Sequence, residues 1–107
     1  MQDPDCIFCK IAKSEIPAKV VYEDDEVMVF PDIRPKARVH LLLMPKRHIP
    51  SLLALNESDS ELVSHLILLL PKLAKAHGID NGFKTAIHTG RLGGQEIDHL
   101  HLHLMGG

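Results

Sequence analysis

The stretch that decides the fold lies near the C-terminal end and reads His99-Leu100-His101-Leu102-His103-Leu104-Met105. Side chains alternate between the two faces of a β-strand, so the pattern predicts a strand over residues 97–105 with histidines on one face and leucines on the other. The leucine face is the expected seat of an amphipathic helix. Three imidazoles could form a solvated polar surface, but their strict alternation after a glycine-rich loop favours a reactive site.

Four other segments are rich in β-forming residues. The predicted strands are residues 18–23 and 26–31, which form a hairpin, then residues 37–44 and residues 83–89. The run at 37–44 is almost wholly apolar at its end, as expected for a central strand that is buried on both faces.

Two segments have helical periodicity. Residues 6–13 predict a short N-terminal helix. A longer amphipathic helix follows the predicted capping box Ser58-x-x-Glu61 and ends near Gly78, with a kink expected at Pro71. Five strands with one long helix predict an α+β fold, in which an antiparallel sheet carries the helix on one face.

Length and composition limit the classes of protein. The 107 residues suit a single domain spanning 1–107, small enough for a metal or a partner subunit to add useful stability. A formal net charge of −2 argues against a partner held by neutralising many phosphates, so no nucleic-acid partner is expected. The longest unbroken apolar run, residues 66–70, is too short to cross a bilayer, and the N-terminus lacks a signal-like pattern. We therefore expect a cytoplasmic protein with no membrane partner.

The alternating histidines resemble the signature of the histidine-triad (HIT) superfamily. Further blocks resemble its Hint branch, in order along almost the whole chain: Cys6-Ile-Phe-Cys-Lys-Ile, Glu15-Ile-Pro-Ala, Val21-Tyr-Glu-Asp-Asp, Phe30-Pro-Asp-Ile-Arg-Pro, His40-Leu-Leu-Leu-Met-Pro-Lys-Arg-His-Ile and Gly93-Gly-Gln-Glu. The resemblance implies the HIT fold, with a five-stranded antiparallel sheet, one long helix and a short N-terminal helix. It also implies a homodimer whose sheets join into one ten-stranded sheet.

The activity that the resemblance implies is hydrolysis of purine nucleoside 5′-phosphoramidates, derivatives of AMP or GMP, at the phosphorus–nitrogen bond. His101 would be the nucleophile and form a nucleotidyl-histidine intermediate. A neutral imidazole can attack near pH 7 because its reference pKa is about 6.5. His103, on the same face, is expected to donate a proton or a hydrogen bond to the leaving group.

The resemblance also implies a set of nucleotide-binding residues: Ile7, Phe8, Phe30, Asp32, Ile33, Leu42, His88, Gly94, Gln95, Glu96, His101 and His103. Core packing is the alternative explanation for each apolar member, and a strand-end turn is the alternative for Asp32. His88 stands where the Hint branch usually has asparagine, and Glu96 where animal members tend to have serine.

Cys6 and Cys9 form a C-x-x-C pair, which in a reducing compartment indicates metal or redox chemistry. The resemblance implies a closed structural zinc site made by Cys6, Cys9, His48 and His99. Two buried thiols or a redox pair remain the alternatives. Of the other histidines, His40 either supports the triad or is a satisfied core residue.

Three other functions remain open at this point. A dinucleoside polyphosphate hydrolase shares the triad. A nucleotide-binding regulatory module would keep the pocket with little catalysis. A zinc protein without a nucleotide role would bind metal only. His65 and His77 fall on the long helix, where we expect solvated positions and no functional role.

Overall fold

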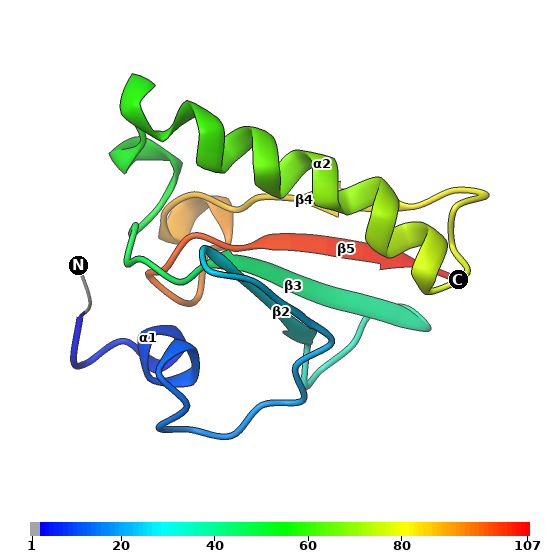
Figure 1. The fold of residues 1–107 in the computed structure, drawn as a ribbon, viewed down its shortest axis with the longest axis horizontal. Helices are drawn as coiled ribbons and strands as arrows, with labels where there is room; N and C mark the ends of the chain where they lie inside the picture. Colours follow the sequence, from blue (N-terminus) through cyan, green and yellow to red (C-terminus); the bar gives the residue numbers. More distant parts are fainter. Residues whose placement is uncertain (1–2) are drawn as a thin grey trace.

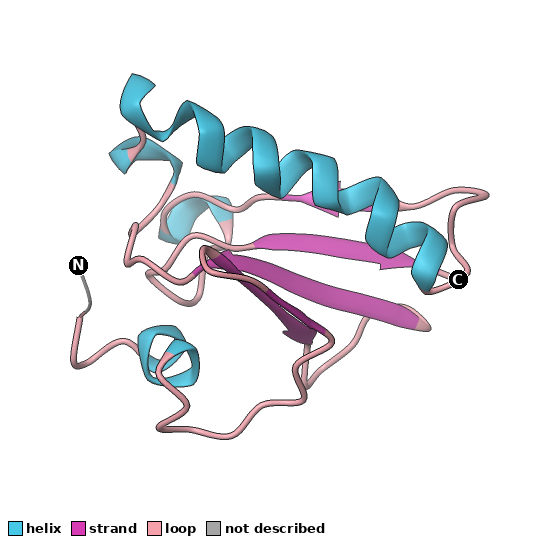
Figure 2. Cartoon of the chain, viewed as in Figure 1, coloured by secondary structure: helices cyan, strands magenta, loops and turns pink. Residues whose placement is uncertain are grey.

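The computed structural model describes residues 3–107 and contains one antiparallel sheet with helices on both sides (Figures 1 and 2). The elements are α1 (Ile7–Ala12), β1 (Tyr22–Glu23), β2 (Val27–Pro31), β3 (Val39–Pro45), α2 (Ser60–Ala76), β4 (Lys84–Ala86) and β5 (Leu102–Gly106), with 3-10 turns at Leu52–Ala54, Glu57–Asp59 and Arg91–Gly93. The five strands lie in the order β1-β2-β3-β5-β4, and every neighbouring pair is antiparallel. The predicted α+β architecture is confirmed.

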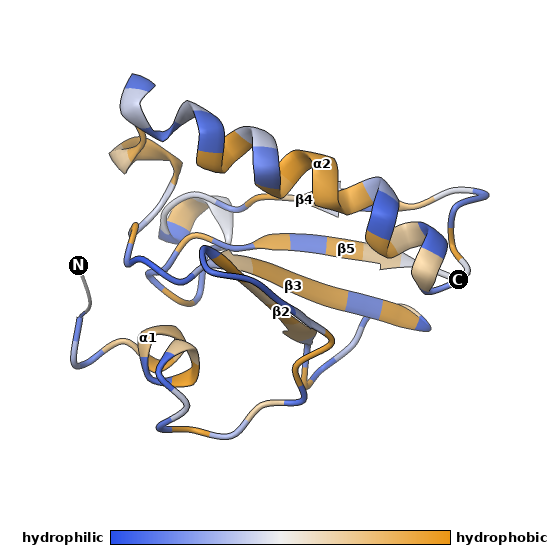
Figure 3. Ribbon diagram, viewed as in Figure 1, coloured by the Kyte–Doolittle hydropathy of each residue, from blue (hydrophilic) through white to orange (hydrophobic). Residues whose placement is uncertain are grey.

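Helix α2 covers one face of the sheet, as the leucine pattern predicted (Figure 1). Its apolar stripe packs into the main core with the leucines beside the histidines: Leu62, Leu66, Leu69, Leu70 and Leu73 with Leu100, Leu102 and Leu104. Figure 3 shows hydrophobic residues along the central strands and, alternating with hydrophilic ones, along α2. Burial of this apolar surface stabilises the helix, because each fully buried leucine contributes about 2 kcal/mol. In residues 3–107 no helix is long and apolar enough to cross a membrane.

A second, smaller core lies on the opposite face, under α1. It contains Phe8, Cys9 and Ile11 from the helical segment and Met28, Phe30, Leu42 and Met44 from β2 and β3. Strands β2 and β3 therefore contribute alternate side chains to both cores, which explains why they read as continuous apolar runs. The two cores cover opposite faces of the central strands, and His99 and His101 lie on the side of the smaller core, against Phe8.

The strand predicted over residues 97–105 is shorter in the structure, since β5 begins at Leu102. The amide of Leu100 instead donates to the carbonyl of Ile49, at 2.6 Å, outside the strand ladder. The predicted faces survive this change: Leu100 lies in the α2 core, while His99 and His101 lie on the other side, against Phe8. Strands β1 and β4 are likewise shorter than the predicted 18–23 and 83–89.

The start of α2 also differs from the prediction. The capping box is formed by Asn56 and Asp59 on the preceding 3-10 turn, whereas the predicted pair was Ser58 and Glu61. The helix continues through Pro71 and ends as expected, with Gly78 at a positive φ of 74° just after the cap residue.

His65 is not the solvated helix residue that the sequence predicted. Its Nε2 lies 2.6 Å from Oδ2 of Asp24, which also accepts a hydrogen bond from the Tyr22 hydroxyl at 2.7 Å. The other oxygen of Asp24 accepts from the amides of Glu26 and Val27. This carboxylate therefore joins α2 to the hairpin between β1 and β2.

The substitution Asp24→Asn is expected to lower the free energy of unfolding at pH 7 by about 2 kcal/mol, since hydrogen bonds to a charged group are lost. Burial raises the pKa of Asp24, but hydrogen bonds from Tyr22, His65 and the backbone outweigh burial and hold the pKa below its usual value. A lowered pKa means that the stabilisation is complete at neutral pH and is lost as the pH falls below about 4.

Urea unfolding of wild type and Asp24→Asn at pH 7 and pH 3 tests this prediction. The difference in free energy of unfolding between the two proteins should be smaller at pH 3. Asp25→Asn is the matched control, because Asp25 is exposed and adjacent in sequence. An equal loss of stability at both pH values would contradict the role given to the Asp24 carboxylate.

Candidate active site and metal centre

The orientation of His101 follows from one hydrogen bond. Its Nδ1 lies 2.7 Å from the carbonyl oxygen of His99. A carbonyl can only accept, so Nδ1 carries the hydrogen and Nε2 carries the lone pair. Burial lowers the pKa of His101, and only 8% of the residue is exposed. A neutral imidazole with a free Nε2 is the form of histidine that can act as a nucleophile.

Neutral His103 carries its hydrogen on Nε2, whereas His101 carries it on Nδ1. This tautomer follows from hydrogen bonds that link the Lys36 amide, His40 and His103. The backbone amide of Lys36 donates to Nδ1 of His40, at 3.0 Å, so the hydrogen of a neutral His40 is on Nε2. That Nε2 lies 2.9 Å from Nδ1 of His103, which must therefore accept. The hydrogen of neutral His103 is then on Nε2. His40 thus supports the triad, the role that the sequence left open.

Both imidazoles of this chain are held neutral. Burial lowers the pKa of His40. Burial, together with the neighbouring imidazoles of His101, His40 and His88, lowers the pKa of His103 to about 4. The side chain of Asp32 lies 3.5 Å from Nε2 of His40 and favours a hydrogen at that position. The site therefore presents a lone pair on His101 beside a hydrogen-bond donor on His103, with ring centroids 5.1 Å apart.

Asp32 combines the two roles that were weighed for it. One carboxylate oxygen accepts from the amide of Arg34, at 2.9 Å, as in a strand-end turn. The other faces His40. The residue is half-buried.

The apolar residues predicted to surround the nucleotide fall into two groups. Phe8, Phe30 and Leu42 are buried in the small core, and the ring of Phe8 meets that of His101 edge-on at 5.1 Å. Ile7 is 44% exposed and Ile33 is 92% exposed. Core packing therefore explains the burial of Phe8, Phe30 and Leu42, whereas the exposed Ile33 is not part of either core.

The glycine-rich loop before the triad is held by the side chain of Gln95. Its amide nitrogen donates to the carbonyls of Pro50 and Ile97, at 2.7 and 2.9 Å, and its oxygen accepts from the amide of Gly90. Gln95 is 2% exposed, so its side chain shapes the loop. Gly94 follows the 3-10 turn with a φ of 88°, a conformation that favours glycine.

Other residues in and beside this loop are exposed. Glu96 is exposed. Asp98 forms a two-pronged ion pair with Arg91, with both nitrogen–oxygen distances at 3.1 Å. His88 is exposed too, and its ring centroid lies 4.9 Å from that of His103.

The four predicted metal ligands come together from three segments. Cys6 caps the start of α1, Cys9 lies within α1, His48 follows β3 and His99 precedes β5. Their ligand atoms all lie within 4.8 Å of one another. The Sγ of Cys6 is 3.3 Å from Nδ1 of His99, and the Sγ of Cys9 is 3.3 Å from Nδ1 of His48 and 3.5 Å from that of His99.

These distances fit a tetrahedral zinc ion. Zinc bonds of about 2.3 Å to sulfur and 2.0 Å to nitrogen place the two ligand atoms about 3.5 Å apart. The Nε2 of His99 lies 2.7 Å from the carbonyl of Pro45, so the hydrogen is on Nε2 and the lone pair of Nδ1 faces the cysteines. Burial lowers the pKa of His99 to about 4, which keeps the ring in the neutral form that binds metal.

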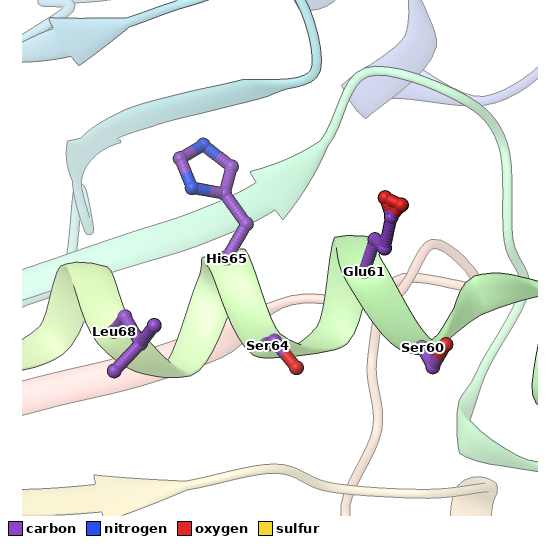
Figure 4. Close-up of a pocket in the computed structure, with 5 residues that line it drawn as sticks. All are labelled: Ser60, Glu61, Ser64, His65 and Leu68. Atoms are coloured by element: carbon purple, nitrogen blue, oxygen red, sulfur yellow. The ribbon is translucent and has the colours of Figure 1, made fainter.

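A hollow of about 370 Å³ lies elsewhere, along helix α2 (Figure 4). Its lining residues are Ser60, Glu61, Ser64, His65 and Leu68. The hollow is shallow and open, and all five residues belong to one helix. It lies on the α2 side of the sheet, so it is separate from the histidine site.

Sequence reasoning missed the tautomer chain from Lys36 to His103. It depends on strand register, because His40 pairs with Met105 and Leu42 pairs with His103, which makes the two histidines diagonal neighbours. It also depends on a backbone amide, which leaves no signal in the residue type. Only the apolar pattern of residues 37–44, predicted as a central strand, suggested that His40 would lie near the triad.

Comparison with known proteins agrees with this geometry. The family model described as "scavenger mRNA decapping enzyme C-term binding" matches residues 5–107. Protein HitA of Neisseria gonorrhoeae is 54% identical over 101 residues, 94% of each chain. The structure of a HIT family hydrolase from Legionella pneumophila Philadelphia 1 matches with a TM-score of 0.94 and 47% identity, over 96% of this chain and 93% of the other. A histidine triad protein from Clostridium difficile matches with a TM-score of 0.95 and 45% identity, over 100% and 94%.

The chain therefore belongs to the histidine-triad (HIT) family. Within that family it is similar, over nearly the full length of both chains, to bacterial members such as HitA.

Proposed function

We propose that this protein hydrolyses purine nucleoside 5′-phosphoramidates, derivatives of AMP or GMP, through a nucleotidyl-histidine intermediate. The observation that carries the proposal is the pair of opposite tautomers. The hydrogen bond from His101 to the carbonyl of His99 leaves the lone pair on Nε2 of His101, while His103 presents a hydrogen on its own Nε2. An adjacent nucleophile and donor are what transfer of a phosphoryl-type group requires.

In the proposed reaction His101 attacks phosphorus and displaces the leaving group, and water then releases the nucleotide. His103 donates a hydrogen bond to the phosphate or to the departing atom. Asp32 and His40 hold the tautomer of His103. Gln95 holds the loop that brings Gly94 and Glu96 to the phosphate side, and we place Ile7, Phe8, Phe30, Ile33, Leu42 and His88 around the nucleotide.

The residues of the metal centre fit a structural role. We propose that Cys6, Cys9, His48 and His99 hold zinc, which would tie α1 to the sheet and take no part in the reaction. His99 links this centre to the nucleophile, because its ring belongs to the metal centre and its carbonyl accepts from His101. We also place this single-domain protein in the cytoplasm, since its two cysteines form no disulfide and thiols that bind metal suit a reducing compartment.

The test compares two substrates with purified protein: an adenosine 5′-phosphoramidate and diadenosine tetraphosphate. The proposal expects a higher kcat/KM for the phosphoramidate. A preference for the dinucleotide would assign the protein to the dinucleoside polyphosphate hydrolases instead. Binding of AMP, seen as a raised Tm, without turnover of either compound would indicate a regulatory nucleotide-binding module.

We also propose that two copies form a homodimer whose sheets join at β4 into one ten-stranded sheet. The strand order leaves β4 at an edge, and such an edge is open to pairing with a second chain. Phe83, directly before β4, is 40% exposed, and Leu68 of α2 is 63% exposed.

Light scattering should therefore give twice the chain mass of 11.9 kDa. The variant Phe83→Glu should weaken dimerisation by about tenfold or more, since a charge replaces an apolar contact. Leu53→Glu is the control. Leu53 is also an exposed apolar residue, at 86%, but it lies in the 3-10 turn Leu52–Ala54 and not in β4 or α2. A monomeric wild type would contradict the dimer.

A further inference from the structure

We propose that His88 supplies the proton that the leaving group takes up, and so decides which leaving groups the protein releases. This inference rests on the proposed function and extends it to the leaving-group side of the site. It assigns a proton-transfer role to a residue for which nucleotide contact alone was expected.

His88 lies at the open side of the histidine cluster. Its ring centroid is 4.9 Å from that of His103, and the ring planes are tilted by 46°. A Cβ at Gly94 would lie 3.9 Å from Cγ of His88, so the ring sits beside the glycine-rich loop. The residue is exposed, and in residues 3–107 its ring nitrogens have no hydrogen-bond partner. Both nitrogens are thus available to a substrate and to solvent.

The other imidazoles cannot supply this proton. The hydrogen of His101 is on Nδ1 and is held by the carbonyl of His99. Neutral His103 has a single hydrogen, on Nε2, because its Nδ1 accepts from His40. Giving up that hydrogen would leave an imidazolate anion, which makes neutral imidazole a far weaker acid than imidazolium. His103 can therefore donate a hydrogen bond but not a proton.

Burial reinforces this division of roles. His40 and His101 are 3% and 8% exposed, and charging a buried imidazole is unfavourable. His88 is exposed to solvent. A solvent-exposed imidazole can act as a general acid in one step and as a general base in the next, which suits both halves of a two-step hydrolysis.

The lone pair on Nε2 of His101 bonds to phosphorus, the phosphorus–nitrogen bond breaks, and its electron pair takes the proton of the His88 imidazolium. Water then bonds to phosphorus, the bond to His101 breaks with its electron pair returning to Nε2, and neutral His88 takes the proton of that water. The imidazolium of His88 is regenerated.

The experiment uses two AMP derivatives with different leaving groups. One is a phosphoramidate that releases an alkylamine, which must be protonated to leave. The other is the 4-nitrophenyl ester, whose phenolate leaves without a proton. In His88→Asn and His88→Ala the ratio of kcat/KM for the phosphoramidate to that for the ester should fall about 10²-fold or more, the usual contribution of general acid catalysis.

His77→Asn is the matched control, because His77 lies at the end of α2 and should leave the ratio unchanged. Unchanged Tm in the His88 variants will exclude misfolding, as expected for an exposed residue. An equal loss of kcat/KM with both substrates would overturn the inference, because a residue that only positions the nucleotide would lower kcat/KM for the phosphoramidate and for the ester by the same factor. A wild type that hydrolyses neither compound would overturn the proposed function, and this inference with it.

Discussion

Replacing His101 with asparagine is expected to lower turnover of a nucleoside phosphoramidate by on the order of 10⁴-fold or more, the scale seen when a nucleophile is removed. Asparagine is chosen because its side-chain amide can still donate to the carbonyl of His99, the bond that Nδ1 makes at 2.7 Å. The substitution therefore deletes the attacking Nε2 and keeps the local hydrogen bond. The rate is measured in single-turnover assays with excess enzyme.

Mass spectrometry of the same reactions provides the second readout. Wild type quenched early should gain the mass of one nucleotidyl group, and peptide mapping should place it on His101. His101→Asn should gain nothing, while its metal content and Tm stay close to wild type. A variant that retains wild-type turnover, or a nucleotidyl group found on another residue, would disprove the assignment of His101 as nucleophile.

The largest effect on stability is expected at the metal centre. Cys9→Ser removes the sulfur that lies 3.3 Å from His48 and 3.5 Å from His99, in a residue that is 1% exposed. A ligand present at about 1,000 times its Kd stabilises a folded protein by about 4 kcal/mol. For a domain of this size each kcal/mol changes Tm by about 4 °C or more, so a loss of roughly 15 °C is expected.

Metal analysis of the purified wild type should find one zinc ion per chain, and a strong chelator should lower its Tm toward that of Cys9→Ser. The chelator should leave the Tm of the variant unchanged, which separates loss of metal from loss of packing. A wild type that contains no metal and whose Tm does not change with the chelator would contradict the zinc site and identify Cys6 and Cys9 as two buried thiols.

The sequence allowed most of the fold to be predicted, because hydrophobic periodicity reports which faces are buried. Alternation across residues 99–104 placed the leucines under α2 and the histidines on the other side, and this holds although β5 begins only at Leu102. The boundaries were less predictable. The amide of Leu100 pairs with Ile49 and not with a strand, a choice that depends on a segment some fifty residues away in the chain.

The C-x-x-C spacing and the resemblance to a known family singled out four residues that the structure brings together and that could hold a metal ion, because metal chemistry restricts the residue types. By contrast, the tautomers of His101 and His103 are decided only by tertiary structure. They follow from a carbonyl of His99 and an amide of Lys36, and every residue except proline carries both groups. The hydrogen bond between His65 and Asp24 could not be predicted for a related reason. The two residues are 41 positions apart in the sequence and meet only because α2 packs across the sheet. The sequence by itself thus determined which residue types face one another, and the packed chain decided which atom of each carries the hydrogen.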